Sequence, residues 1–139
     1  MKKIFIDTNV ILDVTLHRED FLAESIQIWS DCELKKVQGF ISAITLNNMY
    51  FIMRKQVGST VALEYVKLIL TIFTIVPLDE TILRLAANLP HKDFDDAIQT
   101  FSAVQAKAEC IITRDVAHFS KDYIPVISPK EYIELLNIN

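Results

Sequence analysis

Glycine and proline are scarce in this chain of 139 residues, which contains two glycines and four prolines. We see no repeat, no linker and no tail rich in proline and serine, and 51% of the residues are hydrophobic. This composition excludes a disordered or low-complexity chain, because such chains are poor in hydrophobic residues. The length is that of one domain and does not suffice to build two. The sequence therefore predicts a single helix-rich domain over residues 1–139.

The sequence also lacks a hydrophobic stretch long enough to span a membrane. The most apolar stretch, residues 68–78, is flanked by charged residues and is much shorter than the roughly 20 residues that a spanning helix needs. Lys2 and Lys3 precede apolar residues as in a signal peptide, but Asp7 and Asp13 interrupt what would be its hydrophobic segment. We therefore expect a cytoplasmic protein without a membrane partner.

An excess of positive charge is missing as well, because the formal net charge is -4. This argues against binding of nucleic acid by bulk electrostatics, which needs clustered lysine and arginine side chains. Cations bound at a cluster of acids would nevertheless reverse the local charge.

Cys32 and Cys110 form no metal-spaced pair, and we expect buried thiols rather than a disulfide.

Short apolar runs alternate with helical patterns along the chain. The unbroken run at residues 4–6 predicts a strand buried on both faces. Further strands are expected at residues 40–41, 75–77, 110–112 and 126–127. Helices are expected at residues 10–16, 21–36, 42–55, 60–73 and 79–89, from residue 93 onward, and at 129–136, with Asp20 capping the second helix and Gly39 closing it. This alternation predicts a doubly wound α/β fold with about five parallel strands flanked by helices.

The expected helix at residues 60–73 is apolar nearly all round. Glu64 and Lys67 are the exceptions. A helix of this kind is buried on more than one side. Either a homodimer interface or a deep position in the core would bury it, and the sequence leaves both explanations open.

Acidic residues follow two of the expected strands. Asp7 comes directly after the first strand, and Asp115 comes shortly after the fourth. In parallel α/β sheets, ligands bind at the edge where the carboxyl ends of the strands lie. Asp93, Asp95 and Asp96 open the helix that leads into the fourth strand. Three separate segments therefore bring carboxylates to one edge of the sheet.

Helix capping is an alternative role for several of these residues. Asp7, Thr8 or Asn9 can accept hydrogen bonds from the free N–H groups of the helix that follows them. Asp93 is favoured as a cap, with Asp95 on a solvated face, because acids in the first turn suit the helix dipole.

Asp96 fits a cleft better than a cap. Thr100 and Ala103 follow it at helical spacing and form a small, weakly polar line. Converging carboxylates repel one another unless a cation neutralises them, and oxygen ligands suit Mg²⁺ or Mn²⁺. The chemistry that such a site supports is metal-assisted hydrolysis at a phosphate. No Ser-His-Asp arrangement, glycine-rich phosphate loop or cysteine-based zinc motif competes with it.

Four short motifs occur along the chain, namely Asp7-Thr8-Asn9, the segment starting at Ser42, Asp93-Phe94-Asp95-Asp96-Ala97 and Thr113-Arg114-Asp115. Together they resemble a PIN domain of the VapC-like ribonuclease type, found as toxins in toxin–antitoxin pairs. The resemblance covers nearly the whole chain. It implies a PIN-like (Rossmann-like) three-layer sandwich, a Mg²⁺ or Mn²⁺ site, cleavage of RNA, and a homodimer held by a small antitoxin. By motif matching, Asp7, Asp96 and Asp115 are the catalytic and metal-binding acids.

Two positions depart from the family pattern. Asn48 stands where the family commonly carries a glutamate, and an amide without charge implies weaker binding of metal. His118 stands where some members have a further acid, and it is a ligand, a proton carrier, a phosphate contact or an ordinary loop residue. Further accessory candidates around the site are Asn9, Ser42, Asp93 and Thr113.

The sequence leaves three functional hypotheses. The leading one is a metal-dependent endoribonuclease. The second is a PIN-like module that binds RNA or a protein without cleavage, because Asn48 and His118 replace expected acids. The third is a phosphatase or phospho-acceptor with Asp7 as nucleophile, which is disfavoured because Asn9 occupies the place of a second aspartate. Candidates for contacts with the RNA backbone, and equally for ordinary surface charges, are Arg18, Arg54 and Arg114.

Overall fold

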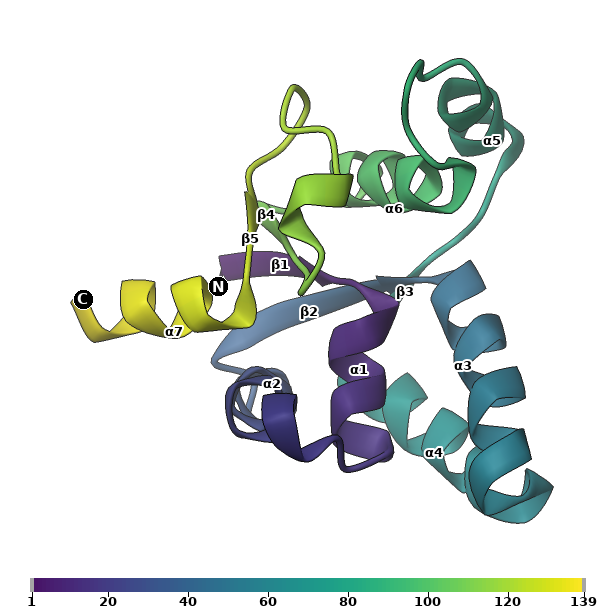
Figure 1. Cartoon of the computed structure of the whole chain (residues 1–139), viewed down its shortest axis with the longest axis vertical. Helices are drawn as coiled ribbons and strands as arrows, with labels where there is room; N and C mark the ends of the chain where they lie inside the picture. The colour runs from purple at the N-terminus through teal and green to yellow at the C-terminus, as the bar shows by residue number, and fades with distance from the viewer. Residues whose placement is uncertain (1, 139) are drawn as a thin grey trace.

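The computed structural model describes residues 2–138, which form one parallel sheet with helices on both of its faces (Figure 1). The strands are β1 (Lys2–Ile6), β2 (Val37–Ser42), β3 (Thr74–Val76), β4 (Cys110–Ile112) and β5 (Val126–Ile127). Their order is β3-β2-β1-β4-β5, and all four neighbouring pairs are parallel. The prediction of an α/β fold with about five parallel strands is confirmed.

The helices divide into two groups that cover opposite faces of the sheet. They are α1 (Thr8–Thr15), α2 (Glu19–Glu33), α3 (Ala43–Val57), α4 (Ser59–Ile72), α5 (Glu80–Ala87), α6 (Phe94–Gln105), α7 (Pro129–Ile138) and the short 3-10 helix η1 (Val116–His118). One hydrophobic core lies between the sheet and the helices α1–α4 and α7. The other lies between the sheet and the helices α5 and α6. The result is the three-layer sandwich that the sequence predicts.

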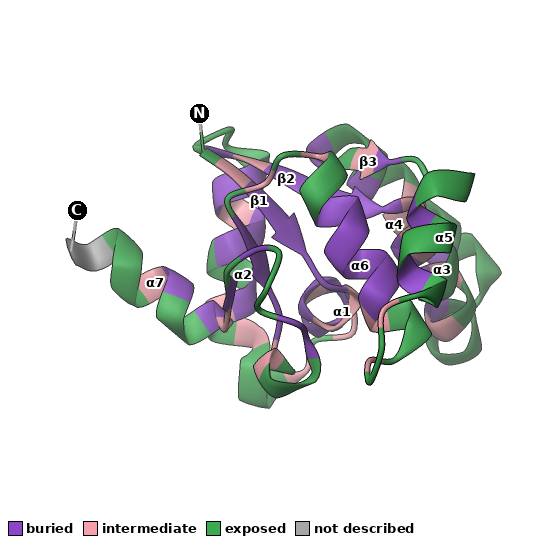
Figure 2. Cartoon of the chain, turned by 90° about the horizontal axis from the view of Figure 1, so that it is seen from above, coloured by how far each residue is buried: buried purple, intermediate pink, exposed green. Residues whose placement is uncertain are grey.

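The apolar run in β1 is explained by these two cores. Ile4, Phe5 and Ile6 are each 0% exposed. Ile4 and Ile6 belong to the core under α1–α4, whereas Phe5 belongs to the core under α6. Successive side chains of a strand point to opposite faces, so a central strand covered on both faces must be apolar throughout. Figure 2 shows this burial along the central strands and along α6.

The predicted ends of the second helix are wrong in two places. Helix α2 begins at Glu19 after Arg18, and Asp20 lies in its first turn, where a carboxylate suits the helix dipole without capping. The helix ends at Glu33 in a Schellman motif, in which Lys35 has the positive φ of 61°. The N–H groups of Lys36 and Lys35 donate to the carbonyls of Asp31 and Cys32. Lys35 therefore ends the second helix, a role that was predicted for Gly39.

Gly39 lies inside β2 instead, where the space for a side chain is missing. A Cβ atom at this position would lie 2.6 Å from Cys32 Sγ and 2.9 Å from Phe73 Cδ1. Glycine therefore allows α2 and the end of α4 to pack closely against β2.

Helix α4 is not deeply buried. Its residues Ala62, Ile69 and Ile72 are buried and pack against the sheet and α3. Apolar side chains on either side of this buried stripe remain between 40% and 52% exposed, namely Val61, Leu63, Leu68 and Leu70. Of the two explanations that the sequence left open, the deep position is therefore excluded.

Both cysteines are buried and free, as predicted. Burial raises the pKa of Cys32 to about 12 and the pKa of Cys110 to about 11. Both side chains are therefore neutral thiols at physiological pH.

Among residues 2–138, no helix combines the length and the apolar character that crossing a membrane requires.

Candidate functional site

A cavity of about 460 Å³ at the carboxyl edge of the sheet contains the three predicted acids. It is lined by Asp7, Thr8, Asn9, Leu12, Ile44, Asn48, Phe51, Ile52, Asp95, Asp96, Gln99 and Asp115. These residues come from the end of β1, from α1, α3 and α6, and from the turn after β4. The topology therefore brings together residues that are more than 100 positions apart, because β1 and β4 are neighbours in the sheet.

Asp7 combines the two roles that the sequence left as alternatives. Its Oδ1 atom accepts a hydrogen bond of 2.8 Å from the N–H of Thr8 at the start of α1. Its Oδ2 atom accepts one of 2.8 Å from Thr113 Oγ1. Burial raises the pKa of Asp7, and the nearby charge of Asp115 also raises it, whereas the two hydrogen bonds lower it. One carboxylate thus caps the helix and lies in the cavity.

Asp115 is exposed and held by its neighbours. Its backbone N–H donates to Thr113 Oγ1 at 3.0 Å. Its Oδ2 atom accepts a hydrogen bond of 3.0 Å from Asn9 Nδ2. Thr113 and Asn9, two predicted accessory residues, therefore orient the acids Asp7 and Asp115.

Helix α6 presents Asp96 to the cavity through its capped first turn. Asp93 caps this helix as predicted, because its Oδ1 atom accepts from the N–H groups of Asp95 at 2.9 Å and Asp96 at 3.4 Å. Burial in the first place, together with the charges of Asp7, Asp93 and Asp115, raises the pKa of Asp96 to about 6, and His118 acts in the opposite direction. The acids of the cavity therefore repel one another in the metal-free protein.

Asp95, which was predicted to lie on a solvated face, and His118, an accessory candidate, differ in their relation to the cavity. Asp95 is exposed, as predicted, and also lines the cavity. His118 ends η1 and is exposed outside the cavity lining, but it lies close enough to Asp96 to act on its pKa.

Asn48 of α3 lines the cavity, whereas Ser42, which directly precedes this helix, does not. Asn48 is exposed and lines the cavity, at the place where the family resemblance implies a glutamate. Ser42 is 0% exposed, and its Oγ atom accepts from the N–H of Ile44. Ser42 is therefore a helix cap behind the cavity rather than part of its wall.

A polar network next to the acids was not predicted from the sequence. Gln99 Nε2 donates to Thr45 Oγ1 at 2.8 Å and to Thr8 Oγ1 at 3.3 Å, and Thr8 Oγ1 donates to Thr45 Oγ1 at 3.0 Å. This network joins α1, α3 and α6. The spacing of Gln99 three residues after Asp96 is a weak signal, since it places both on one side of α6.

The three candidate arginines do not line the cavity. Arg18 and Arg114 form ion pairs with the buried Asp13, at 3.6 Å and 2.8 Å. Arg54 is exposed, and its guanidinium carbon lies 5.2 Å from the centre of the Phe51 ring. Because Phe51 lines the cavity, Arg54 lies beside one of the cavity's wall residues.

The acids fit a hydrated divalent metal ion. Within residues 2–138, no three His, Cys, Asp or Glu side chains lie close enough together to hold one metal ion. Mg²⁺ does not need such a cluster, because proteins usually hold it through one or two carboxylates while it keeps several waters. The repulsion among Asp7, Asp96 and Asp115 is also relieved when a cation lies between them. The donor chemistry therefore suits Mg²⁺ or Mn²⁺.

Comparisons with known proteins agree with this fold. Ribonuclease VapC1 of Aquifex aeolicus is 26% identical over 141 residues, which covers 98% of this chain and 96% of that protein. A toxin–antitoxin complex from Klebsiella pneumoniae contains a chain with a similar fold, at a TM-score of 0.69 and 23% identity, covering 91% of this chain and 97% of that chain. VapC20 of Mycobacterium tuberculosis, a sarcin–ricin loop cleaving toxin, superposes with a TM-score of 0.64 at 13% identity, covering 86% and 92%.

The sequence also matches the family model of the PIN domain. The match extends over residues 3–117, which include Asp7, Asp96 and Asp115. The chain belongs to the PIN domain family.

Proposed function

We propose that this protein is an endoribonuclease that hydrolyses RNA phosphodiester bonds with the help of Mg²⁺ or Mn²⁺, as the toxin of a toxin–antitoxin pair. The observation that carries the proposal is the meeting of Asp7, Asp96 and Asp115 in one cavity. The similarity to ribonuclease VapC1 over nearly the whole chain supports the same reaction.

The proposed mechanism assigns a role to each side chain in the cavity. Asp7, Asp96 and Asp115 would surround a hydrated ion, with one or two of the carboxylates as direct ligands and the others bound through its waters, and Asn48 would offer an uncharged amide oxygen. A bound divalent ion orients a phosphodiester, helps to ionise a water molecule and stabilises charge on the leaving oxygen. Thr113 fixes the Oδ2 atom of Asp7 and leaves the carboxylate little freedom to rotate.

We expect RNA cleavage to require a divalent metal ion. The purified protein is incubated with a mixed structured RNA in Mg²⁺, in Mn²⁺ or in EDTA, and the products are separated by gel electrophoresis. Cleavage with either metal and none in EDTA is the expected result. Cleavage that persists in EDTA contradicts the metal-dependent mechanism.

Two other outcomes would favour the alternative functions. If the protein neither cleaves RNA nor binds Mn²⁺, the non-cleaving PIN-like binding module is favoured. Asn48 in place of a charged ligand would then explain why the metal ion does not bind. If the protein hydrolyses a simple phosphomonoester but not RNA, a phosphatase with Asp7 as nucleophile is favoured.

The proposed partners are a small antitoxin and a second copy of the chain. The similar chain from Klebsiella pneumoniae belongs to a toxin–antitoxin complex, which supports an antitoxin here. The exposed side chains of α4 support a homodimer, because monomers rarely leave a large apolar surface in water.

We expect the double variant Leu63→Lys, Leu70→Lys to shift the protein from dimer to monomer. These side chains are 46% and 52% exposed, so lysine is tolerated in the monomer but places charges in an apolar interface. Light scattering after size-exclusion chromatography measures the mass of each form. Glu64→Lys, which changes an already polar position on the same helix, serves as the control. A wild-type protein that is monomeric at all concentrations contradicts the proposed homodimer.

A further inference from the structure

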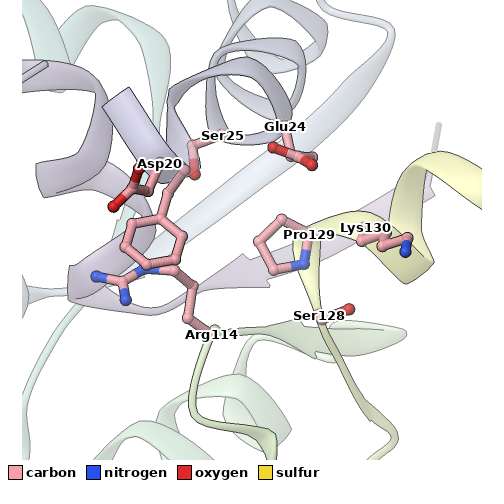
Figure 3. A pocket seen from close by; sticks show the side chains of 8 residues that line it. Asp20, Glu24, Ser25, Arg114, Ser128, Pro129 and Lys130 are labelled. Carbon is pink, nitrogen blue, oxygen red and sulfur yellow. The ribbon is translucent and has the colours of Figure 1, made fainter. Parts of the chain in front are cut away.

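Arg114 stands between two site residues in the chain, but its own side chain is bound elsewhere. Its Nε atom donates to Asp13 Oδ2 at 2.8 Å, and its guanidinium carbon lies 3.9 Å from the centre of the Phe21 ring. Figure 3 shows this side chain extending from the segment after β4 toward α2, beside a cavity of about 410 Å³. Only 22% of the side chain is exposed. Arg114 is therefore held by α1 and α2.

Asp13, the partner of Arg114, is 0% exposed and has no role in the mechanism above. Its Oδ2 atom also accepts from Ser25 Oγ at 3.1 Å, and its Oδ1 atom lies 3.6 Å from Arg18 Nη1. A buried carboxylate is stable only when paired and hydrogen-bonded, and removing one partner is strongly destabilising. The contact with Arg114 is the shortest of the three. Loss of the charge on Asp13 would therefore weaken the hold of α1 on the arginine.

The Asp13–Arg114 pair is connected to Asp115 through α1. The backbone N–H of Arg114 donates to Asn9 Oδ1 at 3.4 Å, and Asn9 Nδ2 donates to Asp115 Oδ2 at 3.0 Å. Asn9 and Asp13 are four residues apart on α1, so they lie on the same face of this helix. One helix therefore binds the segment after β4 twice, at the arginine and at the adjacent catalytic carboxylate.

We propose that Asp13 is a positioning residue, whose ion pair with Arg114 fixes the segment after β4 so that Asp115 stays in the cavity with Asp7 and Asp96. The proposal rests on the metal-dependent function proposed above, in which Asp115 is one of the acids. Asp13 itself has no exposed atom with which to contact RNA or an ion. Its effect on the site must pass through Arg114.

The chain offers a matched control for a variant of Asp13. Asp31 is another buried carboxylate on the same side of the sheet, 3% exposed. It accepts hydrogen bonds from Tyr132 Oη at 3.1 Å and from Gln27 Nε2 at 3.0 Å, and it lies outside the cavity of the three acids. Asp13→Asn and Asp31→Asn therefore make the same chemical change in similar burial, but only the first touches Arg114.

The first readout uses the metal-free protein. We expect the Arg114 Nε–H signal in the NMR spectrum to be protected from exchange in the wild type and in Asp31→Asn, and to lose this protection in Asp13→Asn. The amide signals of residues 113–115 should move only in Asp13→Asn.

The second readout is Mn²⁺ binding and kinetics well below the melting temperature of each variant. Asp13→Asn should weaken Mn²⁺ binding about tenfold, the lower end of the effect typical of groups that orient metal ligands. It should lower kcat by a larger factor than it changes the KM for RNA, because Asp13 has no exposed atom and Arg114 does not line the cavity of the three acids. Asp31→Asn should change none of these quantities by more than about twofold. The loss of Mn²⁺ affinity is expected at the lower end of the typical range because Asp13 acts through Arg114 rather than on a metal ligand directly.

A purely structural role for Asp13 gives a different pattern. If Asp13→Asn lowers the melting temperature but keeps the wild-type Mn²⁺ affinity and kcat, the proposal is overturned. If Asp13→Asn does not fold, Arg114→Gln breaks the same pair at its less buried partner and must show the same loss of Mn²⁺ affinity. If the wild type binds no Mn²⁺, the proposed function fails, and the NMR signals of the metal-free protein alone decide the role of Asp13.

Discussion

Replacement of Asp96 by asparagine is expected to abolish RNA cleavage, with a loss of at least about 100-fold. A metal ion supplies several kcal/mol of stabilisation to the charge that develops in the transition state, and each 1.36 kcal/mol corresponds to about tenfold in rate. Asparagine keeps the shape of the side chain but removes a charged ligand from the cavity. Single-turnover cleavage of a labelled RNA in Mn²⁺ measures the loss.

The same variant should fold at least as well as the wild type without metal. The pKa of Asp96 is raised to about 6, chiefly by burial, so its negative charge destabilises the metal-free protein at pH 7. An equal or higher melting temperature is therefore expected for Asp96→Asn. Asp122→Asn, which changes an exposed aspartate outside the cavity, is the matched control. Undiminished cleavage by Asp96→Asn would refute the assignment of the site.

Binding of Mn²⁺ is expected to weaken about tenfold between pH 8 and pH 5. A carboxylate must be deprotonated to bind a metal ion, so protons compete with the ion. With a pKa of about 6, roughly a tenth of Asp96 is ionised at pH 5 and nearly all of it at pH 8. The raised pKa of Asp7, caused first by burial, acts in the same direction. Isothermal titration calorimetry with Mn²⁺ across this range measures the change.

The stability of the metal-free protein should change in the opposite sense. A carboxyl whose folded-state pKa is raised stabilises the protein fully below its unfolded pKa, here 3.8, and this contribution is lost as the pH rises through about 6. The metal-free protein therefore loses this contribution between about pH 4 and pH 6. The increase in melting temperature on addition of Mn²⁺ should accordingly grow from pH 5 to pH 8.

Asp96→Asn again supplies the control for this pH dependence. Without the carboxyl at position 96, the change of Mn²⁺ affinity with pH should become smaller. An affinity that stays constant from pH 5 to pH 7 in the wild type would show that Asp96 is not a ligand.

Local patterns in the sequence predicted the burial of the central strand and the cap of α6. The apolar run of β1 predicted a strand buried on both faces, and the spacing within residues 93–97 predicted the cap at Asp93, both of which the structure bears out. The alternation of strands and helices predicted the parallel sheet, and with it the edge at which Asp7, Asp96 and Asp115 lie. These features depend on neighbours along the chain and on the general rules of α/β sheets.

Other features were decided by packing between distant segments. In the sequence, Asp13 was only an interruption of an apolar stretch, yet in the fold it is buried against Arg114, 101 positions away. Gln99, Thr45 and Thr8 meet from three helices, and no local spacing indicates that they share hydrogen bonds.

The packing of Gly39 and of α4 also depends on distant segments and was not predicted from the local sequence. From the sequence, Gly39 was predicted to end the second helix, because glycine is common at helix ends. In the structure, Gly39 lies in β2, where the close approach of Cys32 and Phe73 leaves no space for a side chain. The apolar surface of α4 suggested burial on more than one side, while the fold of the single chain covers only one stripe of it.

The sequence by itself determined the α/β fold, the central buried strand and the edge at which the acids lie, because periodicity and strand order follow from local rules. The tertiary structure alone decided which polar groups pair. A pair such as Asp13 and Arg114 forms only when β4 lies beside β1, which brings the segment after β4 against α1. The stability of such a pair depends on the cost of desolvating both charges and on their attraction in the folded core. Neither quantity can be read from the separate segments of the sequence.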